Sequence, residues 1–137
     1  MSEPTDVKWD ELHRVATEAA GRAYAPYSKF TVGAAGLVDD GRVVSGCNVE
    51  NASHGLGLCA ECGLVSNLMS SGGGRLVAVS IVTGDKAPCA PCGRCRQLLL
   101  EHGGVDLAVD FGDGPITMDE LLPHGFTPER LGTDTGS

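Results

Sequence analysis

Three cysteines and one glutamate in the middle of the chain have the residue types and the spacing of a catalytic metal site. Cys59 and Glu61 lie in a Cys-x-Glu segment, and Cys92 and Cys95 lie in a Pro-Cys-x-x-Cys segment. A catalytic zinc site uses three protein ligands and leaves the fourth position to water. Because Zn²⁺ favours the softer thiolates here, the carboxylate of Glu61 suits proton transfer better than coordination. The pattern predicts one Zn²⁺ per chain, held by the three cysteines.

The surroundings of these residues indicate how such a site would react. Cys59 and Cys92 each lie at the expected start of a helix, whose dipole would offset the negative charge of three thiolates. Arg94 and Arg96 flank Cys95 and could hydrogen-bond the thiolate sulfurs. A water molecule on the fourth position would ionise near neutral pH, and Glu61 would take its proton and pass it to the substrate.

Other metal or redox sites are compatible with the same cysteines. Cys59-x-x-Cys62 and Cys92-x-x-Cys95 together have the spacing of a structural four-cysteine zinc site. The second pair alone would suit a thioredoxin-like redox pair. A structural zinc site gives no role to Glu61, and a helix that begins at Cys59 carries Cys62 almost a turn away. The spacing alone leaves both alternatives open.

The composition limits the class of protein and its partners. A chain of 137 residues with 42% hydrophobic residues is long enough for one domain, residues 1–137, and too short for two. Its formal net charge of -8 argues against binding to nucleic acid or an anionic membrane and favours a small neutral or cationic substrate. No apolar run approaches the roughly 20 residues that span a bilayer. The polar N-terminus does not resemble a signal peptide, so the six cysteines predict a reduced, cytoplasmic chain with a metal site.

The order of helical and strand patterns predicts the fold class. The expected elements are a helix over residues 6–23 with Asp6 as its N-cap, strands over 30–38 and 42–49, a helix over 59–70, a strand over 76–83, a helix from 92 to about 103, short strands over 105–109 and 115–118, and a helical turn over 119–122. Glycines at 33 and 36 indicate a bulge or a close backbone approach. We expect an α/β fold, a three-layer α-β-α sandwich with a mixed five-stranded sheet, and a disordered tail over 131–137.

Five segments match one family in order and in residue type. They are Pro26-Tyr27-Ser28-Lys29-Phe30, Val32-Gly33-Ala34-Ala35, Gly46-Cys47-Asn48-Val49-Glu50-Asn51, Cys59-Ala60-Glu61 and Pro91-Cys92-Gly93-Arg94-Cys95-Arg96-Gln97. In these segments the chain resembles the small, homotetrameric, zinc-dependent cytidine deaminases. The resemblance extends from about residue 26 to residue 126 and is more specific than any single Cys-x-x-Cys motif.

The resemblance implies a reaction and a set of substrate contacts. The reaction is the zinc-dependent hydrolysis of cytidine and 2′-deoxycytidine to uridine and 2′-deoxyuridine plus ammonia, a step of pyrimidine salvage. Phe30 would pack on the pyrimidine, Asn48 and Glu50 would hydrogen-bond the ribose, and Ala60 would contact the substrate beside the metal. Phe126 would close the site of a neighbouring subunit in the homotetramer.

The chain departs from the family pattern at two positions, and one rival shares part of the pattern. Cys62 stands where the family commonly has an arginine, which leaves Arg96 to compensate the thiolate charge. His54 stands where a tyrosine is frequent. A deaminase of the antibiotic blasticidin S shares the Pro-Cys-Gly-Arg-Cys-Arg-Gln segment, although Phe30 and Asn48-Val49-Glu50 favour the ribonucleoside enzyme. The remaining Cys47 and Cys89 are interpreted as small buried apolar residues.

Overall fold

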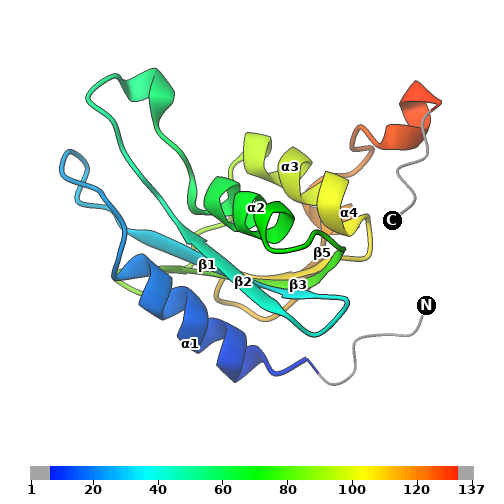
Figure 1. Ribbon diagram of the computed structural model, residues 1–137, viewed down its shortest axis with the longest axis horizontal. Coiled ribbons are helices and arrows are strands. Elements are labelled where there is room, and N and C mark those ends of the chain that lie inside the picture. Colours follow the sequence, from blue (N-terminus) through cyan, green and yellow to red (C-terminus); the bar gives the residue numbers. More distant parts are fainter. Residues whose placement is uncertain (1–6, 133–137) are drawn as a thin grey trace.

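A mixed sheet of five strands separates helix α1 on one face from helices α2, α3 and α4 on the other (Figure 1). The computed structural model describes residues 7–132. The helices are α1 (Trp9–Ala20), α2 (Ala60–Ser70), α3 (Gly93–Gly103) and α4 (Met118–Leu121), and the 3-10 turns are η1 (His54–Leu56) and η2 (Pro128–Leu131). The strands are β1 (Val32–Val38), β2 (Val43–Cys47), β3 (Leu76–Thr83), β4 (Ala108–Asp110) and β5 (Ile116–Thr117). The predicted three-layer α/β sandwich is confirmed.

The order of the strands brings two distant loops to one edge of the sheet. The strand order is β2-β1-β3-β4-β5, with β1 antiparallel to both β2 and β3 and β4 parallel to β3. Since β2 and β3 both run opposite to β1, their carboxyl ends point the same way. The loop that follows β2 leads to α2, and the loop that follows β3 leads to α3. Ligand sites in open α/β sheets form outside such strand ends.

Apolar residues fill both faces of the sheet. Buried side chains of α2, α3 and α4, among them Leu64, Leu99 and Met118, form one cluster with the sheet, and side chains of α1, such as Leu12, form a second cluster on the opposite face. The near-continuous apolar strand β3 contributes to both clusters, as its sequence predicts.

Two glycines let helices pack directly on the sheet backbone. A Cβ atom on Gly33 would lie 2.0 Å from the carbonyl oxygen of Ala16 in α1. One on Gly46 would lie 2.3 Å from the backbone nitrogen of Leu64 in α2. The close approach predicted at Gly33 is therefore confirmed, and the same contact at Gly46 fixes α2 against β2. The helix that follows Cys59 is thus held at a defined height over the sheet.

The element boundaries differ from the predicted ones where backbone groups find other partners. Helix α1 ends at Ala20, three residues early, and Lys8 occupies its N-cap position; Asp6 lies outside the described residues. The short strand β4 begins at residue 108 rather than 105, because the carbonyls of Val105 and Leu107 accept hydrogen bonds from the start of α4. Residues 128–131 form η2, and positions 133–137 of the expected disordered tail lie outside the described residues.

None of the helices within residues 7–132 combines the length and the apolar character that crossing a membrane requires.

Candidate active site

The three predicted metal ligands converge at the amino ends of two helices. Cys59 is the N-cap residue of α2, Cys92 is the N-cap residue of α3, and Cys95 lies in the first turn of α3. Their sulfur atoms all lie within 4.8 Å of one another. In a tetrahedral zinc site with Zn–S distances of about 2.3 Å, sulfur atoms are about 3.8 Å apart. A small contraction would therefore give a zinc geometry, and the three thiols fit the ion.

The three thiols differ in burial and in their ease of ionisation. Cys95 is buried, Cys59 is half-buried and Cys92 is exposed. Burial raises the pKa of the Cys59 and Cys95 thiols. Burial acts in the same direction on Cys92, but hydrogen bonds from the backbone and thiol of Cys95 and from the thiol of Cys59 outweigh it and lower the pKa of Cys92. A bound cation would favour deprotonation of all three thiols.

Cys62 does not join this cluster. Within the described residues, the side chains that lie close enough together to share one metal ion are those of Cys59, Cys92 and Cys95. Cys62 instead lines a separate cavity of about 460 Å³ between α2 and α3, together with Arg94 and Gln97. Cys59 and Cys62 have the same spacing as Cys92 and Cys95, but only the second pair brings both thiols into the cluster, so the packing of each helix and not the spacing decides which thiols meet. The geometry supports a three-thiol site and not a structural four-cysteine site.

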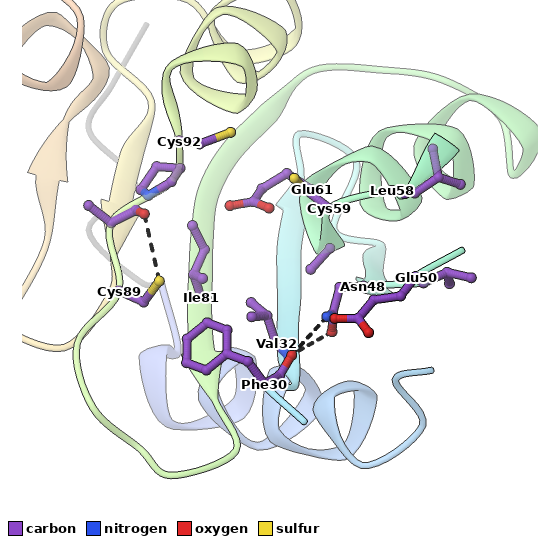
Figure 2. A pocket seen from close by; sticks show the side chains of 15 residues that line it. Phe30, Val32, Asn48, Glu50, Leu58, Cys59, Glu61, Ile81, Cys89 and Cys92 are labelled. Carbon is purple, nitrogen blue, oxygen red and sulfur yellow. Dashed lines mark hydrogen bonds between the residues drawn. The ribbon is translucent and has the colours of Figure 1, made fainter. Parts of the chain in front are cut away.

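Glu61 lies beside the thiols as a buried carboxyl group. It is the second residue of α2, only 4% of it is exposed, and its side chain points into the pocket (Figure 2). Burial raises the pKa of Glu61, while hydrogen bonds from its own backbone and from the Cys95 thiol partly oppose this shift. Raising the pKa of a glutamate towards neutrality makes it a better proton carrier in both directions.

A pocket of about 300 Å³ opens beside Glu61 and two of the three thiols. Its lining residues are Phe30, Val32, Asn48, Val49, Glu50, Gly57, Leu58, Cys59, Ala60, Glu61, Ile81, Cys89, Ala90, Pro91 and Cys92. The volume lies at the lower end of the range for small-molecule sites. The structure therefore brings together four residues that the sequence places at the substrate, namely Phe30, Asn48, Glu50 and Ala60.

The sequence analysis missed the contribution of Cys89 to this pocket. Cys89 is half-buried, and its thiol lines the cavity and donates a 3.8 Å hydrogen bond to the carbonyl of Ala90 (Figure 2). The interpretation of Cys89 as a buried packing residue is wrong, because the loop that precedes α3 lies on the pocket wall and not in the core. Its position three residues before Cys92 was the available signal.

The side-chain amide of Asn48 holds the segment that carries Phe30. Its Oδ1 accepts a 2.8 Å hydrogen bond from the Val32 N–H, and its Nδ2 donates a 2.9 Å hydrogen bond to the Phe30 carbonyl (Figure 2). An amide has two N–H donors, so one donor remains for a ligand. Asn48 thus fixes the backbone next to the aromatic ring, and as a lining residue of the pocket it has one further N–H to offer.

Glu50 lies at the exposed rim of the pocket and is held by the turn at residues 27–28. Its Oε1 accepts hydrogen bonds of 3.0 Å from the Tyr27 N–H and 3.2 Å from the Ser28 N–H, and its Oε2 accepts one from the Ser28 hydroxyl. The Ser28 hydroxyl is the largest cause that lowers the pKa of Glu50, and the two backbone N–H groups add to it. Glu50 is therefore a carboxylate at neutral pH. His54 lies near the same turn, and the centroid of its ring is 6.4 Å from the centroid of the Tyr27 ring.

Arg96 donates to backbone carbonyls near the cysteines. Its Nε donates to the Pro91 carbonyl at 2.8 Å and its Nη1 to the Leu121 carbonyl at 2.7 Å. Within residues 7–132 none of its hydrogen bonds goes to a thiol, so the expected contact with sulfur is not formed. Instead, Arg96 ties the residue before Cys92 to the end of α4.

Phe126 does not line the pocket of its own chain. The ring is exposed and is not part of the pocket lining. The side-chain amide of Gln97 binds the backbone of Phe126 through both of its polar atoms: Nε2 donates to the Phe126 carbonyl at 2.6 Å, and Oε1 accepts from the Phe126 N–H at 3.2 Å. These two hydrogen bonds hold the backbone of Phe126 against helix α3.

The fold and the site agree with one family of enzymes. Residues 7–109 match the model of the cytidine and deoxycytidylate deaminase zinc-binding region. The chain belongs to this family of zinc-binding deaminases. It is 59% identical over 126 residues to the cytidine deaminase of Mycobacterium tuberculosis, an alignment that covers 92% of this chain and 95% of that protein.

Further relatives and a solved structure agree with this assignment. The cytidine deaminase of Halalkalibacterium halodurans is 44% identical over 125 residues, which cover 88% of this chain and 95% of that protein. The crystal structure of cytidine deaminase from Mycobacterium tuberculosis superposes with a TM-score of 0.85 at 59% identity and covers 88% of this chain and 98% of that chain.

Proposed function

We propose that this protein catalyses the zinc-dependent hydrolytic deamination of cytidine and 2′-deoxycytidine to uridine and 2′-deoxyuridine plus ammonia, a step of pyrimidine salvage. The observation that carries the proposal is the buried carboxyl group of Glu61 beside a cluster of three thiols, at one end of a pocket of nucleoside size. The family membership of the chain supports the same reaction.

Cys59, Cys92 and Cys95 would hold one zinc ion, and Glu61 would move the protons. When bound, zinc supplies the Lewis acidity that makes a water molecule nucleophilic near neutral pH. Glu61 would accept one proton from the attacking water and donate it to the ring nitrogen of the pyrimidine. It would then take the second proton, from the hydroxyl group that the water has added to the ring carbon, and deliver it to the amino group, which would leave as ammonia while the water oxygen becomes the carbonyl oxygen of uridine. The raised pKa of Glu61 suits this double role.

The remaining pocket residues would orient the nucleoside. Phe30 lies in the pocket lining with a partly exposed ring, which is suited to pack on the pyrimidine. Asn48 offers one free N–H and Glu50 a carboxylate, a donor and an acceptor for ribose hydroxyls. Ala60 packs at the start of α2 beside the metal ligands. Arg96 would act on the site indirectly, by fixing Pro91 before Cys92.

Two finer statements accompany the activity. We infer a homotetramer with shared sites, supported by exposed apolar residues near the pocket, such as Tyr27 and Leu58, and by the exposed ring of Phe126. We also infer a cytoplasmic location, because the six cysteines are free and the site thiols must stay reduced to bind zinc.

Ammonia release tests the proposed activity. The zinc-loaded protein should release ammonia from cytidine and from 2′-deoxycytidine, with a matching loss of cytidine absorbance. Blasticidin S is the discriminating substrate, since a deaminase of that antibiotic would turn it over faster than cytidine. Failure to deaminate any of the three nucleosides with one zinc bound per chain would contradict the proposal.

A further inference from the structure

The turn between Pro26 and Phe30 supports the rim of the pocket through one hydroxyl group. The side chain of Ser28 donates a hydrogen bond to Oε2 of Glu50. The same oxygen of Ser28 accepts a 3.0 Å hydrogen bond from the backbone N–H of Phe30. The hydroxyl therefore connects two residues that line the nucleoside pocket.

The direction of these two hydrogen bonds is fixed by the available donors. A serine hydroxyl has one proton to donate and two lone pairs that accept. Glu50 is a carboxylate and can only accept, so the hydroxyl proton must point to Glu50. The Phe30 N–H can only donate, so it occupies a lone pair of the Ser28 oxygen. The chain of donors thus runs from the Phe30 backbone through Ser28 to the Glu50 carboxylate, and each bond polarises the next.

The backbone of the turn is shaped to bring Ser28 to this position. Lys29 has a φ of 63°, in the left-handed region that residues other than glycine rarely adopt. Its N–H donates a 3.0 Å hydrogen bond to the Ala25 carbonyl, which closes the turn. The N–H groups of Tyr27 and Ser28 point to Oε1 of Glu50. A turn held in this unusual conformation brings three donors onto one carboxylate.

The three donors also limit what else Glu50 can bind. A carboxylate has about four lone-pair positions, and three of them are used by Tyr27 and Ser28. About one position is left for a ligand hydroxyl. The orientation of that position is set by the Ser28 hydroxyl, because a carboxylate held at only one oxygen can rotate about its last side-chain bond.

We propose that Ser28 is a positioning residue that orients the Glu50 carboxylate towards a single sugar hydroxyl of the nucleoside. Ser28 does not itself line the pocket and acts through Glu50. This role rests on the proposed function, since it assigns a part to Ser28 in the binding of the same substrate.

Ser28→Ala is the direct test, with Ser28→Thr as the variant that keeps the hydroxyl. Ser28→Ala should raise the KM for cytidine about tenfold, the loss expected when a hydrogen bond to a charged group is removed. Its kcat should stay within about threefold of the unaltered protein, because the groups that move protons are unchanged. Ser28→Thr should restore most of the lost affinity. The control is Ser70→Ala, an exposed serine of α2 whose hydroxyl contacts only its own helix.

A double-mutant cycle separates an effect through Glu50 from a general loss of structure. In the Glu50→Ala background, Ser28→Ala should change the KM by less than about twofold, since coupled residues are not additive. A tenfold change that persists in that background would overturn the proposal, and so would a KM for Ser28→Ala that equals that of Ser70→Ala.

A pKa measurement on the protein without substrate tests the role of Ser28 independently of the proposed enzyme activity. The pKa of Glu50, followed by ¹³C NMR of its side-chain carboxyl, should lie below the usual glutamate value and should rise in Ser28→Ala, because the Ser28 hydroxyl stabilises the charged form. An unchanged pKa would overturn the role of Ser28 even if the enzyme is active. Absence of cytidine deamination by the unaltered protein would overturn the proposed function, whatever the NMR result.

Discussion

The two ends of the pocket are built in different ways. At the metal end, Cys59, Glu61, Cys92 and Cys95 sit in the first turns of two helices that are packed on the sheet, and Glu61 and Cys95 are buried. At the end proposed to bind the sugar, here called the sugar end, the polar groups belong to loops, are half-buried (Asn48, Glu50) or exposed (Ser28), and depend on hydrogen bonds between segments about 20 residues apart in the chain.

This difference separates the roles of the two ends. Residues on packed helices keep their geometry without a ligand, which suits groups that must act on the reacting atoms. Residues on exposed loops can be perturbed at little cost in stability, which suits groups that select the substrate. Substitutions at the metal end should therefore abolish metal binding or lower kcat, whereas those at the sugar end should mainly raise KM.

The largest effect is expected from removal of a metal ligand. Cys92→Ser should lose most of the zinc and essentially all activity, because a catalytic zinc site has only three protein ligands. Zinc content per chain, measured by metal analysis beside the ammonia assay, checks this. The matched control is Cys62→Ser, which should retain one zinc per chain, since Cys62 lies outside the thiol cluster. Loss of zinc from the Cys62 variant would instead indicate a four-cysteine structural site.

The next largest effect should come from Glu61, the proposed proton carrier. Glu61→Gln keeps the size of the side chain but cannot accept the proton, so turnover should fall by at least about 10²–10⁴-fold. Zinc content and the binding of cytidine should be retained. Single-turnover kinetics together with equilibrium binding of the nucleoside measure both. Activity within tenfold of the unaltered protein would rule out this role for Glu61.

A smaller effect is expected at Phe126, the residue assigned to a neighbouring site. Phe126→Ala should weaken cytidine binding without loss of zinc, since its ring is exposed and lies outside the pocket lining of its own chain. Sedimentation and activity measured at the same protein concentrations should show activity only in the assembled protein. A fully active monomer would contradict a shared site. Gln97→Ala removes the two hydrogen bonds to the Phe126 backbone. It should also weaken cytidine binding, but by less than Phe126→Ala does.

The most selective effect is expected at Glu50. Free cytosine lacks the ribose hydroxyl that Glu50 would bind, and a hydrogen bond to a charged group contributes about 1.5–3 kcal/mol, so free cytosine should be a very poor substrate. Cytidine monophosphate should also be rejected, because its phosphate would lie near a carboxylate in a chain of net charge -8. Glu50→Gln should raise the KM for cytidine. It should also reduce the difference in activity between cytidine and cytidine monophosphate. Equal turnover of cytosine and cytidine by the unaltered protein would disprove the sugar-reading role.

The sequence alone determines the secondary-structure order and the members of the metal cluster. Hydrophobic periodicity is local, so β3 is predicted with its observed bounds and the helices after Cys59 and Cys92 start within one residue of the predicted position. Thiol spacing and the Cys-x-Glu segment identify the candidate ligands and the candidate proton carrier because the required residue types are rare and close in the chain.

Only the tertiary structure decides where the polar side chains point. Cys62 has the spacing of a ligand but faces another cavity, and Arg96, expected at the sulfurs, donates to Pro91 and to Leu121, 25 residues away. Cys89 joins the pocket, and Ser28 reaches Glu50, 22 residues away. The rotation of a side chain about its helix and the pairing of distant loops depend on hydrogen bonds and packing between segments. A local pattern contains no information about those partners, and they form only when the chain folds around its sheet.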